Sequence, residues 1–279
     1  MRGWLFAGLL LLTQSGLASE RVVSLAPFLT DLMLQLEAGE RLVGVMDDDQ
    51  RAPELPEVPR VGGYQTLSAE RIIAQRPDLI LAWPSGNPSI LLDQLESWGM
   101  RVERFEPQRL ADIEPMVREL GELLDLTASA EQLIADYKRD LARLERPLME
   151  DSPKVFIQLW DDPIYTISDQ QLLGDALRHC GARNVFADLR ILAPQIGRES
   201  VIAADPDIIL LFSGEPENDH PWHQRWRQFP QMSAVRNQRL HALDGDALVR
   251  PTPRIAEGLA DLCAVIWQQK DSAIKPSDR

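Results

Sequence analysis

The sequence predicts an α/β protein made of two Rossmann-like lobes with mostly parallel sheets, joined by a long interdomain helix. Three observations in the 279 residues support this fold class: apolar runs alternate with helical patterns in both halves, a helical stretch separates the halves, and one helix–strand unit occurs in each half. Buried strands that alternate with helices form parallel sheets. We expect an N-terminal lobe at 19–108, the connecting helix at 109–150 and a C-terminal lobe at 151–279.

The N-terminal lobe is predicted from short apolar runs that are rich in β-branched residues and separated by helical patterns. Strands are expected at 21–25, 41–45, 78–82 and 101–105. Helices of about ten residues are expected between them, for example at 30–38 and 88–98. These elements suffice for one open parallel sheet covered on both faces.

The connecting segment is predicted from apolar residues at helical spacing over 110–146, where Gly and Pro are almost absent. One long helix, or two helices in series, fits this pattern. The alternation then resumes, with strands expected at 154–159, 207–212 and 239–243 and a terminal helix at 253–268.

An internal repeat relates the two halves, because residues 68–81 align without gaps on residues 197–210. Glu70 and Glu199 fall at equivalent places, each near the start of a helix. A carboxylate there is favoured by the helix dipole alone. The same carboxylates are also exposed to a partner, and both interpretations stay open at this point.

Residues 1–18 have the layout of a cleavable secretory signal: Arg2 is followed by an apolar run at 5–12 and by a small-x-small site at 16–18. The alternative is a buried N-terminal helix, which this three-part layout disfavours. No cysteine stands at the cleavage point, so a lipid anchor is not expected. Export to an oxidising compartment predicts a disulfide between Cys180 and Cys263 rather than a catalytic thiol.

Composition and motifs exclude several functions. A formal net charge of −14 argues against a nucleic-acid partner, and the sequence lacks a nucleophile elbow, a Walker loop and a zinc-protease motif. His220 and His223 are three residues apart, but the Pro between them suits an exposed loop better than a metal site. No metal is expected, and the acidic run 47–49 is interpreted as a solvated loop.

Aromatic residues follow the predicted strands at the edge where open α/β sheets bind ligands. Trp83 and Trp160 come directly after strands, and Tyr64 lies in a Gly-Gly-Tyr loop before a helix. A single Trp at a strand end is often only the edge of a core. Three rings at corresponding places instead predict a cleft for a bulky ligand.

The chain resembles the helical-backbone (class III) periplasmic binding proteins of ABC importers over nearly all of residues 20–269. The resemblance rests on the opening strand and turn, on the helix–strand unit of each lobe, and on a Thr-Pro-Arg-Ile segment near the end, at 21–27, 67–83, 194–199 and 252–255. The Ala82-Trp83 and Pro194-Gln195 contexts and the cysteine pair are more similar to the cobalamin-binding branch of the family.

The resemblance implies a non-enzymatic, monomeric periplasmic carrier with no cofactor of its own, which holds cobalamin or another corrinoid between its lobes. It implies that Glu70 and Glu199 dock onto arginines of the ABC permease in the inner membrane. It also implies a set of ligand contacts: Asp48, Tyr64, Trp83, Trp160, Asp246, Ala247, Leu248, Val249 and Arg250.

The sequence departs from the cobalamin branch at several large rings. Ala193 replaces a tryptophan, and Ala247 and Leu248 stand where the branch has two aromatic residues. A corrinoid precursor, a siderophore or haem therefore remain alternative ligands. A function of another class, an exported hydrolase or metal-dependent enzyme on a two-lobed scaffold, is the second hypothesis.

Overall fold

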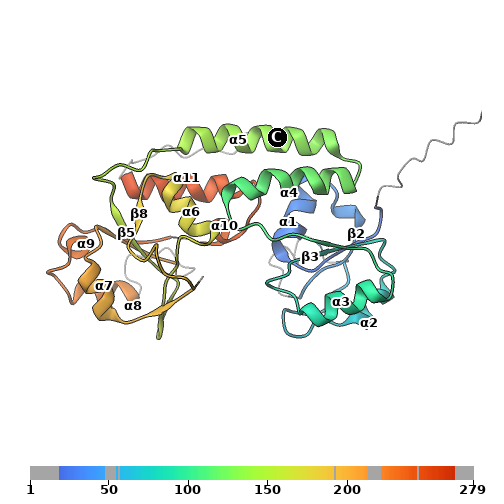
Figure 1. The fold of residues 1–279 in the computed structure, drawn as a ribbon, viewed down its shortest axis with the longest axis horizontal. Coiled ribbons are helices and arrows are strands. Elements are labelled where there is room, and N and C mark those ends of the chain that lie inside the picture. The colour runs from blue at the N-terminus through green and yellow to red at the C-terminus, as the bar shows by residue number, and fades with distance from the viewer. Residues whose placement is uncertain are drawn as a thin grey trace, which may run out of the picture.

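The computed structural model describes residues 19–47, 55, 57–191, 193–212, 221–243 and 245–267. Two α/β lobes lie side by side beneath a layer of helices (Figure 1). The segment 1–18, interpreted above as a secretory signal, lies outside the described residues. No helix in the described part of the chain is long and apolar enough to cross a membrane.

The first lobe is built on a parallel four-stranded sheet with the order β2-β1-β3-β4. Its strands are β1 (Val22–Ser24), β2 (Leu42–Gly44), β3 (Leu79–Ala82) and β4 (Val102–Arg104). Its helices are α1 (Pro27–Gln35), the 3-10 turn η1 (Gly39–Arg41), α2 (Ala69–Ala74) and α3 (Ser89–Ser97).

Successive side chains of these strands point to opposite faces of the sheet. Val22 and Leu79 are paired in register and pack with α1, whereas their neighbours Val23 and Ile80 pack with α2 and α3. Both faces are therefore buried. This explains why β1 and β3 appear in the sequence as apolar runs rather than as an alternation, whereas the edge strand β4 carries Glu103 and Arg104.

The connecting segment contains two helices, α4 (Leu110–Leu123) and α5 (Thr127–Leu144), and α5 folds back over α4 (Figure 1). In the turn between them, Asp125 has a φ of 56° and the N–H of Leu126 donates to the carbonyl of Gly121. A Cβ at Gly121 would lie 2.4 Å from the Cβ of Ala130. Glycine is needed there because the two helices approach closely.

The second lobe is built on a parallel sheet with the order β11-β10-β5-β8. Its strands are β5 (Lys154–Gln158), β8 (Arg183–Asn184), β10 (Ile208–Leu211) and β11 (Leu240–Ala242). Its helices are α6 (Leu172–His179), α7 (Arg198–Ala204), α8 (Pro221–Arg227), α9 (Ser233–Arg236), α10 (Asp246–Val249) and α11 (Ile255–Trp267).

A small antiparallel sheet accompanies the second lobe and was not expected. It consists of β6 (Trp160–Asp161), β7 (Ile164–Tyr165) and β9 (Gln195–Ile196), in the order β6-β7-β9. Its two-residue strands are too short to produce a periodic pattern in a sequence. It is nevertheless important for the site, because it carries Trp160.

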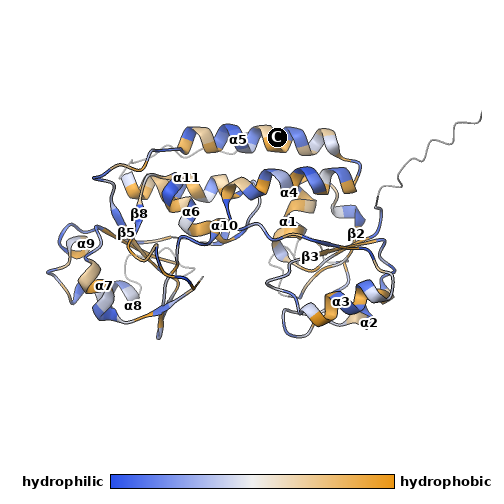
Figure 2. Ribbon diagram, viewed as in Figure 1, coloured by the Kyte–Doolittle hydropathy of each residue, from blue (hydrophilic) through white to orange (hydrophobic). Residues whose placement is uncertain are grey.

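One hydrophobic cluster runs through both lobes. It joins the α1 face of the first sheet, the inner faces of α4 and α5, and the face of the second sheet that is covered by α6, α10 and α11. The other face of each sheet has its own cluster, with α2 and α3 in the first lobe and α7 and α8 in the second. Hydrophobic residues dominate α1 and the strands, whereas hydrophobic and hydrophilic residues alternate along α5 (Figure 2).

A buried carboxylate joins α1 to the segment that precedes α11. Asp31, whose side chain is 3% exposed, accepts hydrogen bonds from the Thr252 hydroxyl at 3.1 Å and from Arg254 at 3.3 Å. Thr252 is fully buried. The two lobes are therefore connected by a polar contact as well as by the shared hydrophobic cluster.

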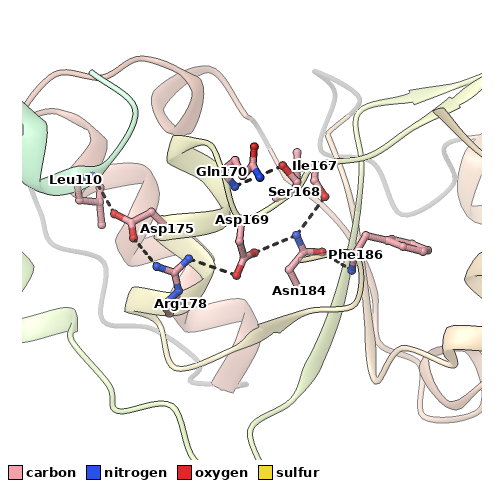
Figure 3. A network of polar contacts seen from close by, with 9 residues as sticks. All are labelled: Leu110, Ile167, Ser168, Asp169, Gln170, Asp175, Arg178, Asn184 and Phe186. Carbon is pink, nitrogen blue, oxygen red and sulfur yellow. Dashed lines mark hydrogen bonds and ion pairs between the residues drawn. The ribbon is translucent and has the colours of Figure 1, made fainter. Parts of the chain in front are cut away.

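A polar network ties the start of α4 to the second lobe (Figure 3). The backbone N–H of Leu110 donates to Asp175 at 2.9 Å, and Arg178 pairs with both Asp175 and Asp169. Asp169 also accepts from Asn184 at 3.2 Å. These bonds fix the position of the start of α4, where the chain enters the helical layer, against α6 of the second lobe.

The Tyr137 hydroxyl of α5 donates to the carbonyl of Leu110 at 2.9 Å, at the same end of α4. Burial raises the pKa of this phenol, and the neighbouring carboxylates of Asp175 and Asp112 add to the shift. The phenol is thus kept in its neutral, hydrogen-bond-donating form.

Cys180 and Cys263 form a disulfide, as the sequence predicts, with their Cα atoms 5.1 Å apart. The bond joins the end of α6 to α11 across 83 residues of chain. In the chain-entropy model, closing a loop of this length stabilises the folded state by about 4.5 kcal/mol.

Candidate ligand-binding site

Trp83 directly follows β3, at the carboxyl edge of the first sheet. Its indole Nε1 donates to Oε1 of Glu106 at 3.0 Å, and its backbone N–H donates to the side chain of Asn87 at 2.7 Å. Asn87 is buried and also donates to the carbonyl of Leu25. Both the backbone and the ring of Trp83 are therefore held by hydrogen bonds.

Three aromatic rings meet at this edge. The Trp83 ring lies edge-on to Phe28, with centroids 5.9 Å apart, and edge-on to Tyr64, with centroids 6.4 Å apart. A Cβ at Gly86 would lie 2.0 Å from Cε3 of Trp83, so glycine lets the backbone lie against the ring. Tyr64 is 37% exposed and Trp83 is half-buried, so the group presents aromatic surface to solvent.

Trp160 occupies the corresponding place in the second lobe, just after β5, and is 60% exposed. Its strand β6 is held by contacts of the neighbouring residue Asp161. Asp161 forms an ion pair with Arg225 of α8 and accepts from Gln158 at 3.1 Å. Gln158 in turn accepts from the indole N–H of Trp226 at 2.7 Å. These contacts fix the backbone that carries Trp160, whereas the Trp160 ring itself is exposed to solvent.

The segment 246–250 forms the short helix α10 and its end. Asp246 pairs with Arg250, with Oδ1 3.0 Å from Nη2, and their side chains are 46% and 13% exposed. Val249 is 56% exposed. Leu248 is only 1% exposed and packs in the core of the second lobe, where a Cβ at Gly258 would meet it.

These observations divide the residues that the resemblance singles out for ligand contact. Tyr64 and Trp83 are brought into contact, and Trp160 is presented by the other lobe. The burial of Leu248 leaves its side chain no surface for a ligand, and we leave it out of the proposed contacts. Asp48 lies outside the described residues.

Glu70 and Glu199 are both exposed, on α2 and α7. These helices pack on their sheets through Ile72 and Val201, and both lie on the side of the molecule opposite α5 (Figure 1). The Ser68 hydroxyl caps α2 by accepting from the backbone N–H of Arg71 at 3.3 Å. The internal repeat therefore places one carboxylate per lobe on the same side.

In the described part of the chain, no three His, Cys, Asp or Glu residues are grouped so as to hold a metal ion. His223 is 1% exposed in α8, and His220 lies outside the described residues. A cavity of about 560 Å³ at the β2 edge is lined by residues such as Glu40, Val58 and Gln75. None of the expected ligand contacts lines it, so the aromatic edge is the better candidate site.

Sequence reasoning missed Glu106. It lies two residues beyond β4, and β4 pairs with β3 so that Arg104 is opposite Ala82. The pairing places residue 106 beside the segment that follows Trp83. The available signal was an acidic residue just after a strand that neighbours the one carrying an aromatic residue.

Over most of its length the chain is similar to known proteins. Residues 22–247 match the model of the family described as "Periplasmic binding protein". A vitamin B12-binding protein of Vibrio parahaemolyticus is 30% identical over 90% of this chain and 91% of its own length. The periplasmic vitamin B12 binding protein of Vibrio cholerae superposes with a TM-score of 0.76 at 29% identity, covering 90% of this chain and 99% of that one. A periplasmic heme binding protein of Pseudomonas aeruginosa gives a TM-score of 0.76 at 26% identity, covering 91% and 94%.

Proposed function

The chain belongs to the periplasmic binding protein family, and from this premise we propose that it captures cobalamin or a related corrinoid between its two lobes and delivers it to an ABC importer. The family consists of solute-binding proteins rather than enzymes, so a hydrolase on this scaffold is set aside. The observation that carries the proposal is the ring pair of Tyr64 and Trp83 at the carboxyl edge of β3, with Trp160 presented by the second lobe.

A corrin ring is large and has broad apolar faces with polar groups around its rim. Aromatic side chains offer such a ligand a large contact area, and charged groups nearby can contact its rim. Asp246 and Arg250 lie in and directly after α10, the element that follows β11, and are suited to the second role. The relatives named as vitamin B12-binding proteins support the choice of a corrinoid.

Haem is the second candidate ligand, and a siderophore the third. The structural relative named as a heme binding protein favours the former. The absence of large rings at Ala193 and Ala247 favours any ligand that needs fewer aromatic contacts than cobalamin.

Delivery is assigned to Glu70 and Glu199, which would pair with arginines of the permease. Two charge-assisted contacts on one side of the molecule would set the orientation of docking as well as add affinity. In this proposal residues 1–18 direct export, the carrier acts as a monomer in the periplasm, and lobes 19–108 and 151–279 hold the ligand from opposite sides.

The ligand is tested by calorimetry on the chain lacking residues 1–18, with cyanocobalamin, cobinamide, hemin and a ferric siderophore. We expect the corrinoids to bind at micromolar concentration or tighter. Trp83→Ala should weaken that binding roughly tenfold, since an aromatic contact contributes on the order of 1 kcal/mol beyond its buried area. Trp98→Ala is the matched control, because Trp98 is 49% exposed at the end of α3. Binding of hemin alone would transfer the proposal to haem.

Docking is tested by corrinoid uptake in cells that depend on this carrier. Glu70→Ala with Glu199→Ala should abolish uptake and leave the calorimetric affinity unchanged. Glu122→Ala, an exposed carboxylate on α4, is the control. Loss of ligand affinity in the double variant would assign the two glutamates to the ligand site or to the fold instead.

A further inference from the structure

We propose that Glu106 is a positioning residue that fixes the plane of the Trp83 ring before the ligand arrives, so that the ring acts as a rigid wall for a flat macrocycle. The inference rests on the proposed function, because it assigns Glu106 a role in the same site. Glu106 lies outside the set of residues that the resemblance implies.

Both oxygens of the Glu106 carboxylate bind the segment that carries the ring. Oε1 accepts from the Trp83 indole N–H at 3.0 Å, and Oε2 accepts from the backbone N–H of Ser85 at 2.8 Å. Because Glu106 binds both the Trp83 indole and the backbone of Ser85, it fixes the orientation of the ring relative to the turn that follows β3. Both distances are typical of N–H···O hydrogen bonds.

The carboxylate is itself well anchored. The preceding residue, Phe105, is 3% exposed, and its backbone N–H donates to the carbonyl of Ala82 at 2.9 Å. This bond continues the ladder between β4 and β3. The backbone at Glu106 is therefore fixed, and its side chain extends from the end of β4 to Trp83 at the end of β3.

Packing restrains the ring at other points and leaves part of it exposed. Phe28 and Tyr64 contact the ring edge-on, and the backbone at Gly86 lies against it. Glu106 holds the nitrogen edge, where a purely apolar neighbour would leave the indole N–H without an acceptor. A ring held in this way loses less conformational freedom on binding, and preorganisation of this kind raises affinity.

The hydrogen bonds of Glu106 are exposed to solvent, so they contribute little to global stability. This distinguishes a positioning role from a structural one. Removing the carboxylate should alter the ring and the binding of ligand, and leave the thermal midpoint nearly unchanged.

The first measurement needs no ligand. In ¹H–¹⁵N spectra of the folded chain, the indole signal of Trp83 is identified by its absence in Trp83→Phe. We expect Glu106→Ala to shift this signal and to speed exchange of its indole proton by at least about tenfold, because the proton loses its acceptor. Glu106→Gln keeps one acceptor and should give an intermediate result. Glu103→Ala, a carboxylate on β4 that pairs with Arg101, should leave the signal unchanged.

The second measurement is the affinity for cyanocobalamin by calorimetry. Glu106→Ala should weaken binding about 3- to 10-fold, which is the loss expected when one large side chain must be ordered on binding. Gly86→Ala, which pushes against the ring from the other side, should weaken binding similarly. In a Trp83→Phe background, Glu106→Ala should have no further effect.

The outcomes separate the inference from the proposed function. An unchanged Trp83 indole signal in Glu106→Ala overturns the inference whatever the ligand. A changed indole signal with unchanged cyanocobalamin affinity also overturns the inference, because the orientation of the Trp83 ring would then not affect ligand binding. If the unaltered chain bound neither a corrinoid nor hemin, the proposed function would fail and the inference with it, while the indole result would still describe the fold; if it bound hemin alone, the affinity measurement would be made with hemin.

Discussion

Replacing Asp31 by Asn tests whether the buried contact between the lobes stabilises the protein. The substitution keeps the size of the side chain but removes its charge. Oδ2 of Asp31 accepts from Thr252 at 3.1 Å and Oδ1 accepts from Arg254 at 3.3 Å. An amide can accept only one of these bonds and places an N–H₂ group against the other donor.

The magnitude follows from the exposure of the three residues. Thr252 is fully buried and the Asp31 side chain is 3% exposed, but Arg254 is 43% exposed and can be hydrated again once its partner is lost. The loss of one hydrogen bond to a charged group destabilises a protein by about 1.5–3 kcal/mol, and removal of a buried charge offsets part of this. We expect Asp31→Asn to lower the free energy of unfolding by about 2 kcal/mol.

Urea unfolding followed by circular dichroism measures this change. Asp93→Asn is the matched control, because Asp93 pairs with Arg104 at 3.0 Å but is 70% exposed. Such an exposed pair contributes at most about 1 kcal/mol. A double-mutant cycle with Thr252→Val should give a coupling energy of about 1 kcal/mol. Equal losses in Asp31→Asn and Asp93→Asn, with no coupling to Thr252, would refute the reasoning.

Two further predictions concern the second lobe. Replacing Cys180 and Cys263 together by Ala should lower the free energy of unfolding by about 4 kcal/mol, seen as a lower urea midpoint that no longer responds to reductant; a midpoint equal to that of the oxidised chain would contradict it. Burial, with smaller contributions from Arg239 and His223, lowers the pKa of His241 below its ordinary 6.5. Protonation of His241 therefore favours the unfolded chain. The free energy of unfolding should fall from pH 7 to pH 5 more steeply in the unaltered protein than in His241→Leu. Parallel pH profiles of the two proteins would show that His241 does not cause the pH dependence.

Strands that are buried on both faces, such as β1, β3 and β10, could be predicted, whereas the two-residue strand β8 of the second sheet was not expected. Val22 packs toward α1 and Val23 toward α2 and α3, so both faces of β1 carry apolar residues. The turn between α4 and α5 could not be placed, because Leu124 and Leu126 on either side of Asp125 continue the apolar pattern. The positive φ of Asp125 depends on the packing of one helix against the other.

The site was predictable only where residues are adjacent to strand ends in the sequence. Trp83 and Trp160 were singled out in this way, and their role in ligand binding stays a prediction. Glu106 contacts Trp83 across 23 positions of the chain, and Asp31 contacts Thr252 across 221. Such contacts follow from the register of strands and the packing of helices, which no periodicity within one segment reveals.

The hydrophobic cluster that passes from the first sheet through α4 and α5 into the second has a consequence for folding. Neither lobe can bury its inner face alone, because α4 and α5 cover parts of both. We expect the two lobes to unfold in a single cooperative transition rather than one after the other. A ligand that touched only one of them would then raise the melting temperature of the whole chain.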